Sequence, residues 1–297
     1  MTNKRFARST GTRALPKQVI YSVRNRSTVS RLLHDRRAVF CMAILLLLVL
    51  LCLFAFLSPY DPNHLSLQER LSPPSAAHWF GTDDHGRDYL TRVLYGGRVS
   101  LSVGFLSMLI AVLVGTSIGT ISGYLGGIVD SLFMRFLDLF MSLPSFFLLM
   151  ILNAYLKPSV RNIIIIIGLL SWMDVARIVR SQTMSLKEQE FMLYSRTIGE
   201  SMGRTIIRHV VPGAMPSIVV AASLNVANAI LTESALSFLG LGVQPPASSW
   251  GSMLNNAQGY IGTADYLAVF PGILILIVIL SFNILGDTLR DALEPKD

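Results

Sequence analysis

The feature that most constrains this chain is an uninterrupted apolar run of 20 residues at positions 38–57. At about 1.5 Å of rise per residue, a helix of that length just crosses the roughly 30 Å hydrocarbon core of a bilayer. Five further long apolar stretches follow it along the chain. The pattern predicts an all-α integral membrane protein with six transmembrane helices. The expected spans are residues 38–57, 100–123, 132–156, 162–179, 217–239 and 266–285.

The composition indicates the same class of protein. Hydrophobic residues make up 52% of the chain and charged residues 14%, with a mean hydropathy of +0.54. A soluble domain usually has about a quarter of its residues charged, so too few charges remain here to cover a water-exposed surface. The net charge of +7 does not indicate a nucleic-acid partner, because the basic residues lie between the apolar stretches. Cys41 and Cys52 both lie in the first span, about 16 Å apart along a helix, and are expected to be packing residues rather than a disulfide.

Basic residues orient the predicted helices across the membrane. Six spans place both termini on one side, which carries 19 lysines and arginines against six on the other side. The positive-inside rule therefore predicts that both termini are cytoplasmic. The first span follows a long basic stretch and precedes no small-residue cleavage site, so we expect it to be retained rather than removed as a signal peptide. The expected organisation is a cytoplasmic leader at residues 1–37, a first transmembrane helix with an external segment at 38–99, and a five-helix core at 100–297 that contains a cytoplasmic loop at 185–213.

One polar segment, residues 190–213, separates the fourth and fifth predicted spans. Its apolar residues recur at steps of three or four, which predicts an amphipathic helix. Gly199 weakens a continuous helix and permits a bend or a close approach by another backbone. Two interpretations follow from the residues alone: a basic helix that lies on the inner leaflet, or a docking element for a soluble partner. The apolar stripe consists of Phe191, Tyr194, Ile198, Met202 and Ile206.

The spacing of this segment resembles the cytoplasmic "EAA" loop of ABC-importer permeases. The match comprises residues 193–195, then Gly199, then residues 209–212 that end in Pro212. Leu-Tyr-Ser stands where that family has an acidic residue followed by two alanines, and Glu190 is the nearest acid. In that family the loop forms the coupling helix that docks into a cleft of the ATPase subunit. The resemblance therefore implies ATPase-coupling roles for Glu190, Leu193, Tyr194, Ser195, Arg196, Gly199, Glu200, His209 and Pro212.

Four other stretches narrow the resemblance. Residues 80–101 contain GTDDHGRD and, with residues 134–145, 229–254 and 282–296, are similar to the C-type membrane subunit of dipeptide, oligopeptide and nickel permeases. The resemblance implies the fold of a type I ABC importer permease in the bacterial cytoplasmic (inner) membrane. It also implies four kinds of partner: a homologous second permease, two ABC ATPases that bind ATP and magnesium, an external solute-binding protein, and a peptide as substrate. Nickel, antimicrobial peptides and other small solutes remain alternative substrates.

The resemblance also suggests where an external binding protein docks. The loop after the fifth span, which contains QPPASSWG, is expected to meet it. The residues expected to make this contact are Gln244, Pro245, Pro246, Trp250 and Gly251.

Polar residues inside the fifth predicted span form the candidate translocation path. Asn225, Asn228, Thr232 and Glu233 lie within one arc of a helix of 100° per residue. A charge in hydrocarbon is costly, so this face is expected to meet the bundle interior or a water-filled cavity. The alternatives are a hydrogen-bond cluster between helices and a position at the external boundary. Pro144 in the third span is expected to kink a helix that moves, and it completes the candidate path.

Other residues are expected to be structural. Gly115, Gly119 and Gly123 repeat every four residues and predict close packing against another helix. Arg135 and Asp138 are spaced for a local ion pair. The stretch Asp83-Asp84-His85 is interpreted as a turn rather than as a metal site, because the five histidines of the chain show no recognised ligand spacing.

The sequence has no ATPase or HExxH metalloprotease motif. No glycine is followed by lysine, so the phosphate-binding loop of ATPases is absent, and HExxH does not occur. We therefore expect no catalytic residue, metal site or cofactor in this chain. Two rival classes remain: a secondary transporter that uses Glu233 as its ion-coupling carboxylate, and a scaffold whose basic leader binds lipid or a regulator.

Overall fold

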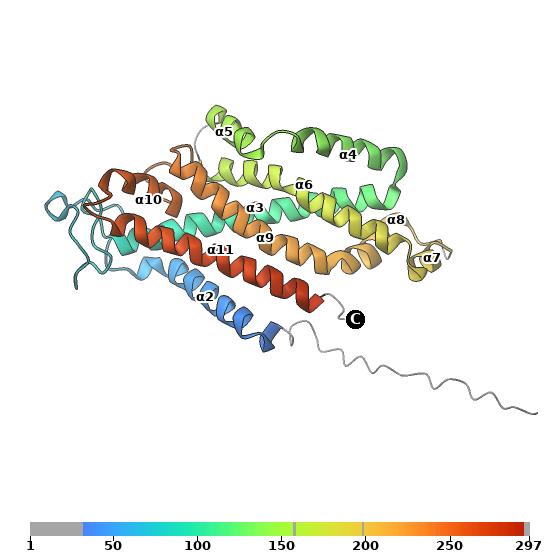
Figure 1. The fold of residues 1–297 in the computed structure, drawn as a ribbon, viewed down its shortest axis with the longest axis horizontal. Coiled ribbons are helices and arrows are strands. Elements are labelled where there is room, and N and C mark those ends of the chain that lie inside the picture. Colours follow the sequence, from blue (N-terminus) through green and yellow to red (C-terminus); the bar gives the residue numbers. More distant parts are fainter. Residues whose placement is uncertain (1–31, 157–158, 198, 294–297) are drawn as a thin grey trace, which may run out of the picture.

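The computed structural model describes residues 32–156, 159–197 and 199–293 (Figure 1). Within these ranges the chain is helical and has no β-strand, with a single isolated bridge between Thr82 and Asp88. Most of the predicted leader lies outside the described residues. The main helices are α2 (Arg36–Leu53), α3 (Tyr89–Leu125), α4 (Gly127–Met141), α5 (Ser145–Tyr155), α6 (Val160–Lys187), α7 (Glu190–Thr197), α8 (Met202–Thr205), α9 (Val211–Phe238), α10 (Trp250–Ala257) and α11 (Tyr266–Leu293). Short 3-10 turns occur at Ala55–Leu57, Leu67–Glu69 and Gln258–Tyr260, and a π-helical turn occurs at Ile206–Val210.

The lengths and compositions of these helices confirm the predicted all-α membrane fold. In the described part of the chain, five helical segments are long and apolar enough to cross a bilayer. They are α2, α3, α6, the continuous run Met202–Phe238, and α11. The helices α4 and α5 make a sixth span if they are taken together.

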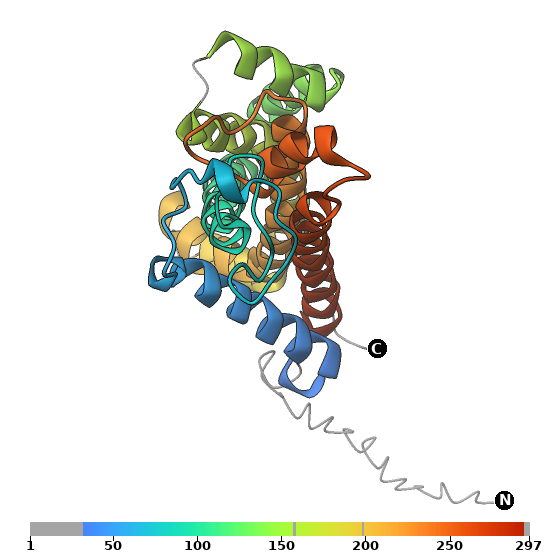
Figure 2. The ribbon, with the colours of Figure 1, turned by 90° about the vertical axis from the view of Figure 1, so that its left-hand side faces the viewer.

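The helices lie side by side between two ends of the molecule, which we name by the helices found there. The α7 end contains α7 and α8, and the α10 end contains α10 and residues 58–88 (Figure 1). Viewed towards the α10 end, α2 flanks the bundle on one side and α4 with α5 on the opposite side (Figure 2). The helices α3, α6, α9 and α11 lie between these two flanks.

The packing of α3 against α6 depends on glycines, as the sequence predicted. A methyl group built on Gly115 would lie 2.7 Å from the Trp172 carbonyl oxygen, and one on Gly119 would lie 2.6 Å from that of Ala176. A methyl group on Gly123 would similarly lie 2.8 Å from the Arg180 carbonyl oxygen. These distances leave no room for a side chain, so the two backbones approach closely along three turns.

The helix α3 begins three turns earlier than expected. Residues 89–99, predicted as part of an external segment, form its first turns. Asp88 explains this start, because its carboxylate accepts hydrogen bonds from the Thr91 amide at 2.8 Å and from the Thr91 hydroxyl at 2.6 Å. An aspartate in this position satisfies the free amides at the start of a helix.

The third predicted span is not one kinked helix. It is broken between Met141 and Ser145, and α4 and α5 meet at 80°. Pro144 explains the break, because proline has no amide hydrogen and disfavours helical geometry in the residue before it. Its side chain is exposed at the bend.

Two ion pairs attach α4 to α6. Asp130 pairs with Arg180, and Asp138 pairs with Arg177 at 2.9 Å. The predicted pair of Arg135 with Asp138 is therefore wrong, because the acceptor is taken by an arginine from the neighbouring helix.

The first span is joined to α3 at its carboxyl end. The Arg98 guanidinium donates hydrogen bonds to the carbonyl oxygens of Cys52 at 2.6 Å and Leu53 at 2.8 Å. These are among the carbonyls that a helix leaves unpaired at its end. Cys41 and Cys52 are buried free thiols, as predicted.

The close contact of α3 with α6 predicts a specific mutational effect. Gly119→Ala should lower the free energy of unfolding by about 1–3 kcal/mol, because the new methyl group overlaps the α6 backbone. Thermal unfolding of the purified protein in detergent measures the change. Gly259→Ala is the matched control, since a methyl group there meets no atom within 4 Å. Equal stability of the two variants would contradict the role of the glycine contact.

Candidate functional site

The segment between α6 and α9, residues 190–213, folds as a helix, a turn and a second helix. Gly199 has a φ of +74°, in the left-handed region, and a methyl group on it would meet no atom within 4 Å. Glycine is therefore favoured here by the backbone angle and not by lack of space. The chain reverses at this turn, where the Glu200 amide donates to the Ser195 carbonyl oxygen at 3.2 Å. The predicted amphipathic helix is interrupted at Gly199, where the sequence permitted a bend, and Ile198 lies outside the described residues.

A small polar cluster closes this turn. The Ser195 hydroxyl on α7 donates to the Glu200 carboxylate, and the same carboxylate oxygen lies 3.2 Å from Nε2 of His209. The Ser195 and Thr205 hydroxyls lie 3.4 Å apart. Ser195 is only 3% exposed, so its hydroxyl must be satisfied by these neighbours.

The hydrogen bond from Ser195, together with the charges of His209 and Arg208, holds the pKa of the Glu200 carboxyl below its usual value. A lowered carboxyl pKa means that the folded chain favours the ionised form. The contribution of Glu200 to stability is therefore complete above the ordinary pKa of about 4.3 and is lost only as the pH falls through the lower folded value. At neutral pH the cluster contains a carboxylate.

The other face of α7 is turned outward. Tyr194 is 69% exposed and Phe191 is 44% exposed, and Glu190 is exposed beside them. Pro212 is the second residue of α9 and is also exposed. The side chains of Leu193 and Arg196 lie outside the described part of the structure. The segment thus has an inner polar cluster and an outer surface that contains aromatic side chains.

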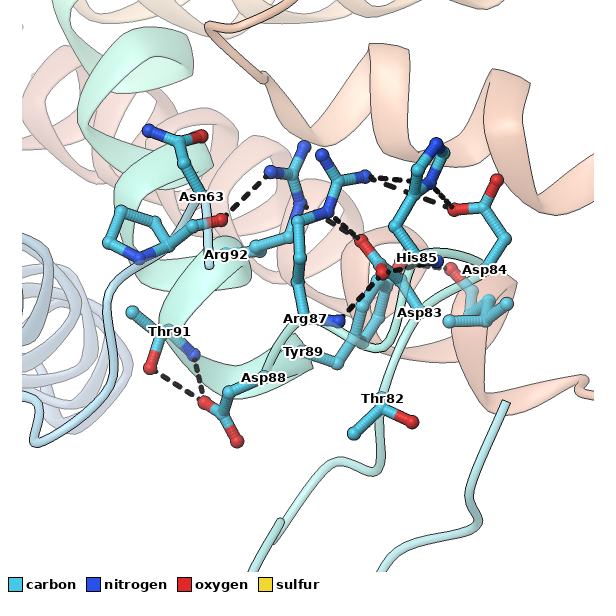
Figure 3. Close-up of polar contacts among 12 residues, drawn as sticks. Asn63, Thr82, Asp83, Asp84, His85, Arg87, Asp88, Tyr89, Thr91 and Arg92 are labelled. Carbon is cyan, nitrogen blue, oxygen red and sulfur yellow. Dashed lines mark hydrogen bonds and ion pairs between the residues drawn. The ribbon is translucent and has the colours of Figure 1, made fainter. Parts of the chain in front are cut away.

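A second polar cluster holds the α10 end together (Figure 3). The Asp83 carboxylate lies 2.7 Å from Nε of Arg87 and 3.3 Å from Nε of Arg92. Arg92 also donates to the Pro62 carbonyl oxygen at 3.1 Å. Arg92 is 5% exposed and Asp83 is 5% exposed, so the pair is buried. One carboxylate therefore fastens the loop of residues 62–87 to the first turn of α3.

The same loop contains the acids and histidine that were considered as metal ligands. Ligand atoms of Asp83, Asp84 and His85 all lie within 4.8 Å of one another. However, Arg87 and Arg92 neutralise the Asp83 carboxylate, and Arg87 also lies 3.3 Å from Nδ1 of His85. Because arginine side chains already pair with two of the three candidate ligands, the geometry favours the interpretation as a folded turn.

Glu233 occupies a third cluster, between α3, α9 and the start of α10. It is completely buried, and its two carboxyl oxygens accept from Ser237 at 2.6 Å and Ser100 at 3.3 Å. The Ser249 hydroxyl continues the chain of contacts to Ser237 at 3.3 Å. Of the hypotheses left open by the sequence, this geometry favours a hydrogen-bond cluster between helices, since the side chain reaches no surface of the chain.

The remaining polar residues of the fifth span do not share one environment. Asn225 is buried with an unpaired side-chain oxygen, whereas Asn228 is exposed and Thr232 is half-buried. A groove of about 450 Å³ lies elsewhere, on the α7-end half of α9. Its floor contains Gly213, Ser217 and Ala221, and its walls contain Gln182 of α6 and Arg290 of α11. The path role of the predicted residues remains a prediction, and the groove was not foreseen because its walls come from three separate spans.

Of the residues expected to contact the binding protein, some lie at the surface and others are buried. Gln244 and Pro245 line an open hollow of about 210 Å³, and Pro246 is exposed next to them. Trp250 is completely buried, with its indole N–H donating to the Val93 carbonyl oxygen at 2.9 Å. A methyl group on Gly251 would lie 2.5 Å from the Ser234 Cα. Trp250 and Gly251 were wrongly predicted as contact residues, because they pack into the core.

The hollow also contains residues that the sequence did not bring together. They lie on the loop before α3 and on α10 and include Asp84, His85, Arg87, Asn255 and Asn256. The sequence marked both stretches, since each one resembles part of the same permease subunit. Only the tertiary fold brings them together.

Comparison with known families accounts for this arrangement of helices and loops. Residues 115–296 match the family of binding-protein-dependent transport system inner membrane components. The chain belongs to this family. Residues 26–74 of the permease also match the N-terminal transmembrane domain of oligopeptide transport permease C.

Several curated relatives are similar to this permease over nearly their whole lengths. The dipeptide transport system permease protein DppC of Alkalihalophilus pseudofirmus is 41% identical, over 91% of this chain and 90% of the relative. The oligopeptide transport system permease protein OppC of Escherichia coli K12 is 44% identical, over 90% and 89%. The glutathione transport system permease protein GsiD of Pectobacterium atrosepticum is 38% identical, over 90% and 89%.

A solved structure supports the fold of the permease. A chain from an inward-facing crystal form of the MetNI methionine ABC transporter superposes with a TM-score of 0.56 at 19% identity. The superposition covers 68% of this chain and 97% of the other. The helices thus have the fold of a type I ABC importer permease.

The ion pairs of the α10 end predict a second mutational effect. Asp83→Asn should lower the free energy of unfolding by about 3–5 kcal/mol, because it leaves the buried Arg92 guanidinium without its carboxylate partner. Thermal unfolding in detergent measures the loss. Asp84→Asn is the control, since that side chain is 23% exposed and an exposed pair contributes about 1 kcal/mol or less. If both variants lost the same stability, the Asp83 cluster would not be what holds this loop.

Proposed function

We propose that this chain is the membrane-spanning permease subunit of an ATP-driven importer that moves peptides across the bacterial cytoplasmic membrane. The observation that carries the proposal is the segment of residues 190–213. It presents exposed aromatic side chains on α7 and is fastened to His209 in the turn that leads into α9, which we call the base of α9. Such a segment suits a soluble motor that pushes on a transmembrane helix. The names of the relatives, which transport dipeptides, oligopeptides and glutathione, support a peptide as substrate.

The partners follow from this assignment. A homologous second permease would complete the pathway, two ABC ATPases would bind ATP and magnesium, and an external solute-binding protein would deliver the peptide. The excess of basic residues at the α7 end supports a cytoplasmic position for that end. The chain itself would hydrolyse nothing, since it has no phosphate-binding loop.

The residues of this chain suggest how the motor acts on the pathway. A displacement of α7 would be passed to the first turns of α9, which follows α7 and α8 in the chain. The helix α9 runs continuously from Val211 to Phe238 and contains Glu233. The hydrogen bonds of Glu233 would then pass the movement to α3 and α10, which lie beside the entry loops. The chain provides the pathway and its gating but not the energy.

Reconstitution tests the proposal directly. The permease, its homologous partner, the two ATPases and the binding protein from the same organism are placed in proteoliposomes with labelled di- to pentapeptides outside. We expect uptake that requires ATP inside, the binding protein outside, and the phosphate-binding lysine of the ATPases. Uptake driven by an ion gradient without ATP would overturn the proposal. Uptake of nickel but not of peptides would change the proposed substrate and leave the proposed ATP-driven mechanism unchanged.

Glu233 separates this proposal from an ion-coupled transporter. Glu233→Gln keeps one acceptor oxygen, and its NH2 group can donate to the other serine hydroxyl, so uptake should stay within about twofold. Glu233→Ala leaves buried hydroxyls unpaired at a cost of about 1–3 kcal/mol. Uptake assays and thermal unfolding measure both effects. A coupling carboxylate would tolerate neither variant, so complete loss of uptake in a stable Glu233→Gln protein would favour the rival class.

Gly199 tests the role of the turn in residues 190–213. Gly199→Val should abolish peptide-stimulated ATPase activity, because a β-branched residue disfavours a φ of +74°. Gly199→Asn should retain most of it, because asparagine adopts this conformation more readily and the added side chain meets open space. Similar activity of the two variants would show that the backbone of the turn does not matter for coupling.

A further inference from the structure

We infer that Glu200 is a positioning residue of residues 190–213, which fastens α7 to the base of α9 so that the two helices move as one body. The inference rests on the proposed function and adds to it the group that transmits the displacement. Glu200 lies outside the triplet at residues 193–195 that the family pattern marks, and its role follows from the contacts of its side chain.

The attachment of α7 to the rest of the chain is narrow. Of its described side chains, Met192 and Ser195 are buried, with exposed fractions of 0% and 3%, whereas Glu190, Phe191 and Tyr194 are exposed. Met192 provides an apolar contact that has no direction. Ser195 provides a directional contact, through hydrogen bonds to Glu200 and Thr205.

Glu200 joins this contact to the next helix. The side chain of Glu200 is only 7% exposed although the residue belongs to a surface turn. One of its oxygens receives the Ser195 hydroxyl and lies 3.2 Å from Nε2 of His209. A carboxylate that accepts from both sides of a turn fixes the distance between them, and hydrogen bonds to a charged group are stronger than neutral ones.

The position of His209 completes the connection. It lies in the π-helical turn Ile206–Val210, which passes directly into α9 at Val211. A π turn contains one more residue than an α turn and changes the direction of the side chains that it carries. His209 therefore presents its ring to Glu200 from the helical segment that continues through the membrane. A force on α7 would therefore reach α9 through three side chains as well as through the backbone of the Gly199 turn.

Substitution of Glu200 in the reconstituted complex tests the inference. We expect Glu200→Ala to lower the number of peptides imported per ATP hydrolysed about tenfold, which corresponds to about 1.4 kcal/mol. Glu200→Gln can place an acceptor oxygen at the same position, so its ratio should stay within about twofold of the wild type. The ratio is the critical readout, because a merely structural residue would change the amount of assembled complex and not the number of peptides per ATP.

Three further variants test for misfolding and for a general effect of charge. Ser195→Ala should lower the ratio in the same direction, and the Ser195→Ala, Glu200→Ala double variant should be no worse than the Glu200 variant alone, since both remove one connection. Asp291→Ala, an exposed carboxylate near the end of α11, should leave the ratio unchanged. If Glu200→Ala fails to assemble, Ser195→Ala decides the question.

The outcomes separate this inference from the proposed function. A wild-type complex without ATP-dependent peptide uptake overturns the proposed function. A wild-type complex that transports, together with a Glu200→Ala complex that assembles and imports the normal number of peptides per ATP, overturns the inference about Glu200 alone. Additive effects in the double variant would also overturn it.

Discussion

The close approach of the α3 and α6 backbones is the constraint on which the rest of this structure depends. Gly115, Gly119 and Gly123 present no side chain to α6, and Gly168 of α6 is equally tight against Ile110 of α3. In a bilayer, apolar burial does not drive helices together, so packing at such short range must hold them. This contact fixes the position of α6 against α3, and residues 190–213 follow the end of α6.

Three polar clusters also hold the structure together, and each one joins elements that the contact of α3 with α6 does not join. Asp83 fastens the entry loop to the start of α3, Glu233 joins α3 to α9 and α10, and Glu200 joins α7 to the base of α9. Two of the three clusters involve the same long helix. At about 1.5 Å per residue, α9 separates them by roughly the thickness of the membrane. The helix is thus the physical connection between the two ends of the permease.

Much of the fold could be predicted from the sequence, and the failures have identifiable causes. The apolar runs located the spans because membrane helices must be long and apolar, and the spacing of Gly115, Gly119 and Gly123 predicted their packing. The break at Pro144 was underestimated, since a sequence shows that a helix is weakened but not by what angle it bends. Trp250 was misplaced because an aromatic residue in a loop has the same pattern whether it faces solvent or the core. The contacts of Glu200 required the turn at Gly199, which no periodicity reveals.

The two ion pairs that attach α4 to α6 differ in their response to ionic strength. The side chains of Asp138 and Arg177 are 69% and 50% exposed, whereas those of Asp130 and Arg180 are 14% and 25% exposed. At physiological salt, charges in water are screened over about 8 Å, and buried pairs are screened much less. The exposed pair is therefore the weaker of the two, and it lies closer to the bend at Pro144. Dissolved ions would loosen α4 from that side first, while its first turn stays attached to α6 as a pivot.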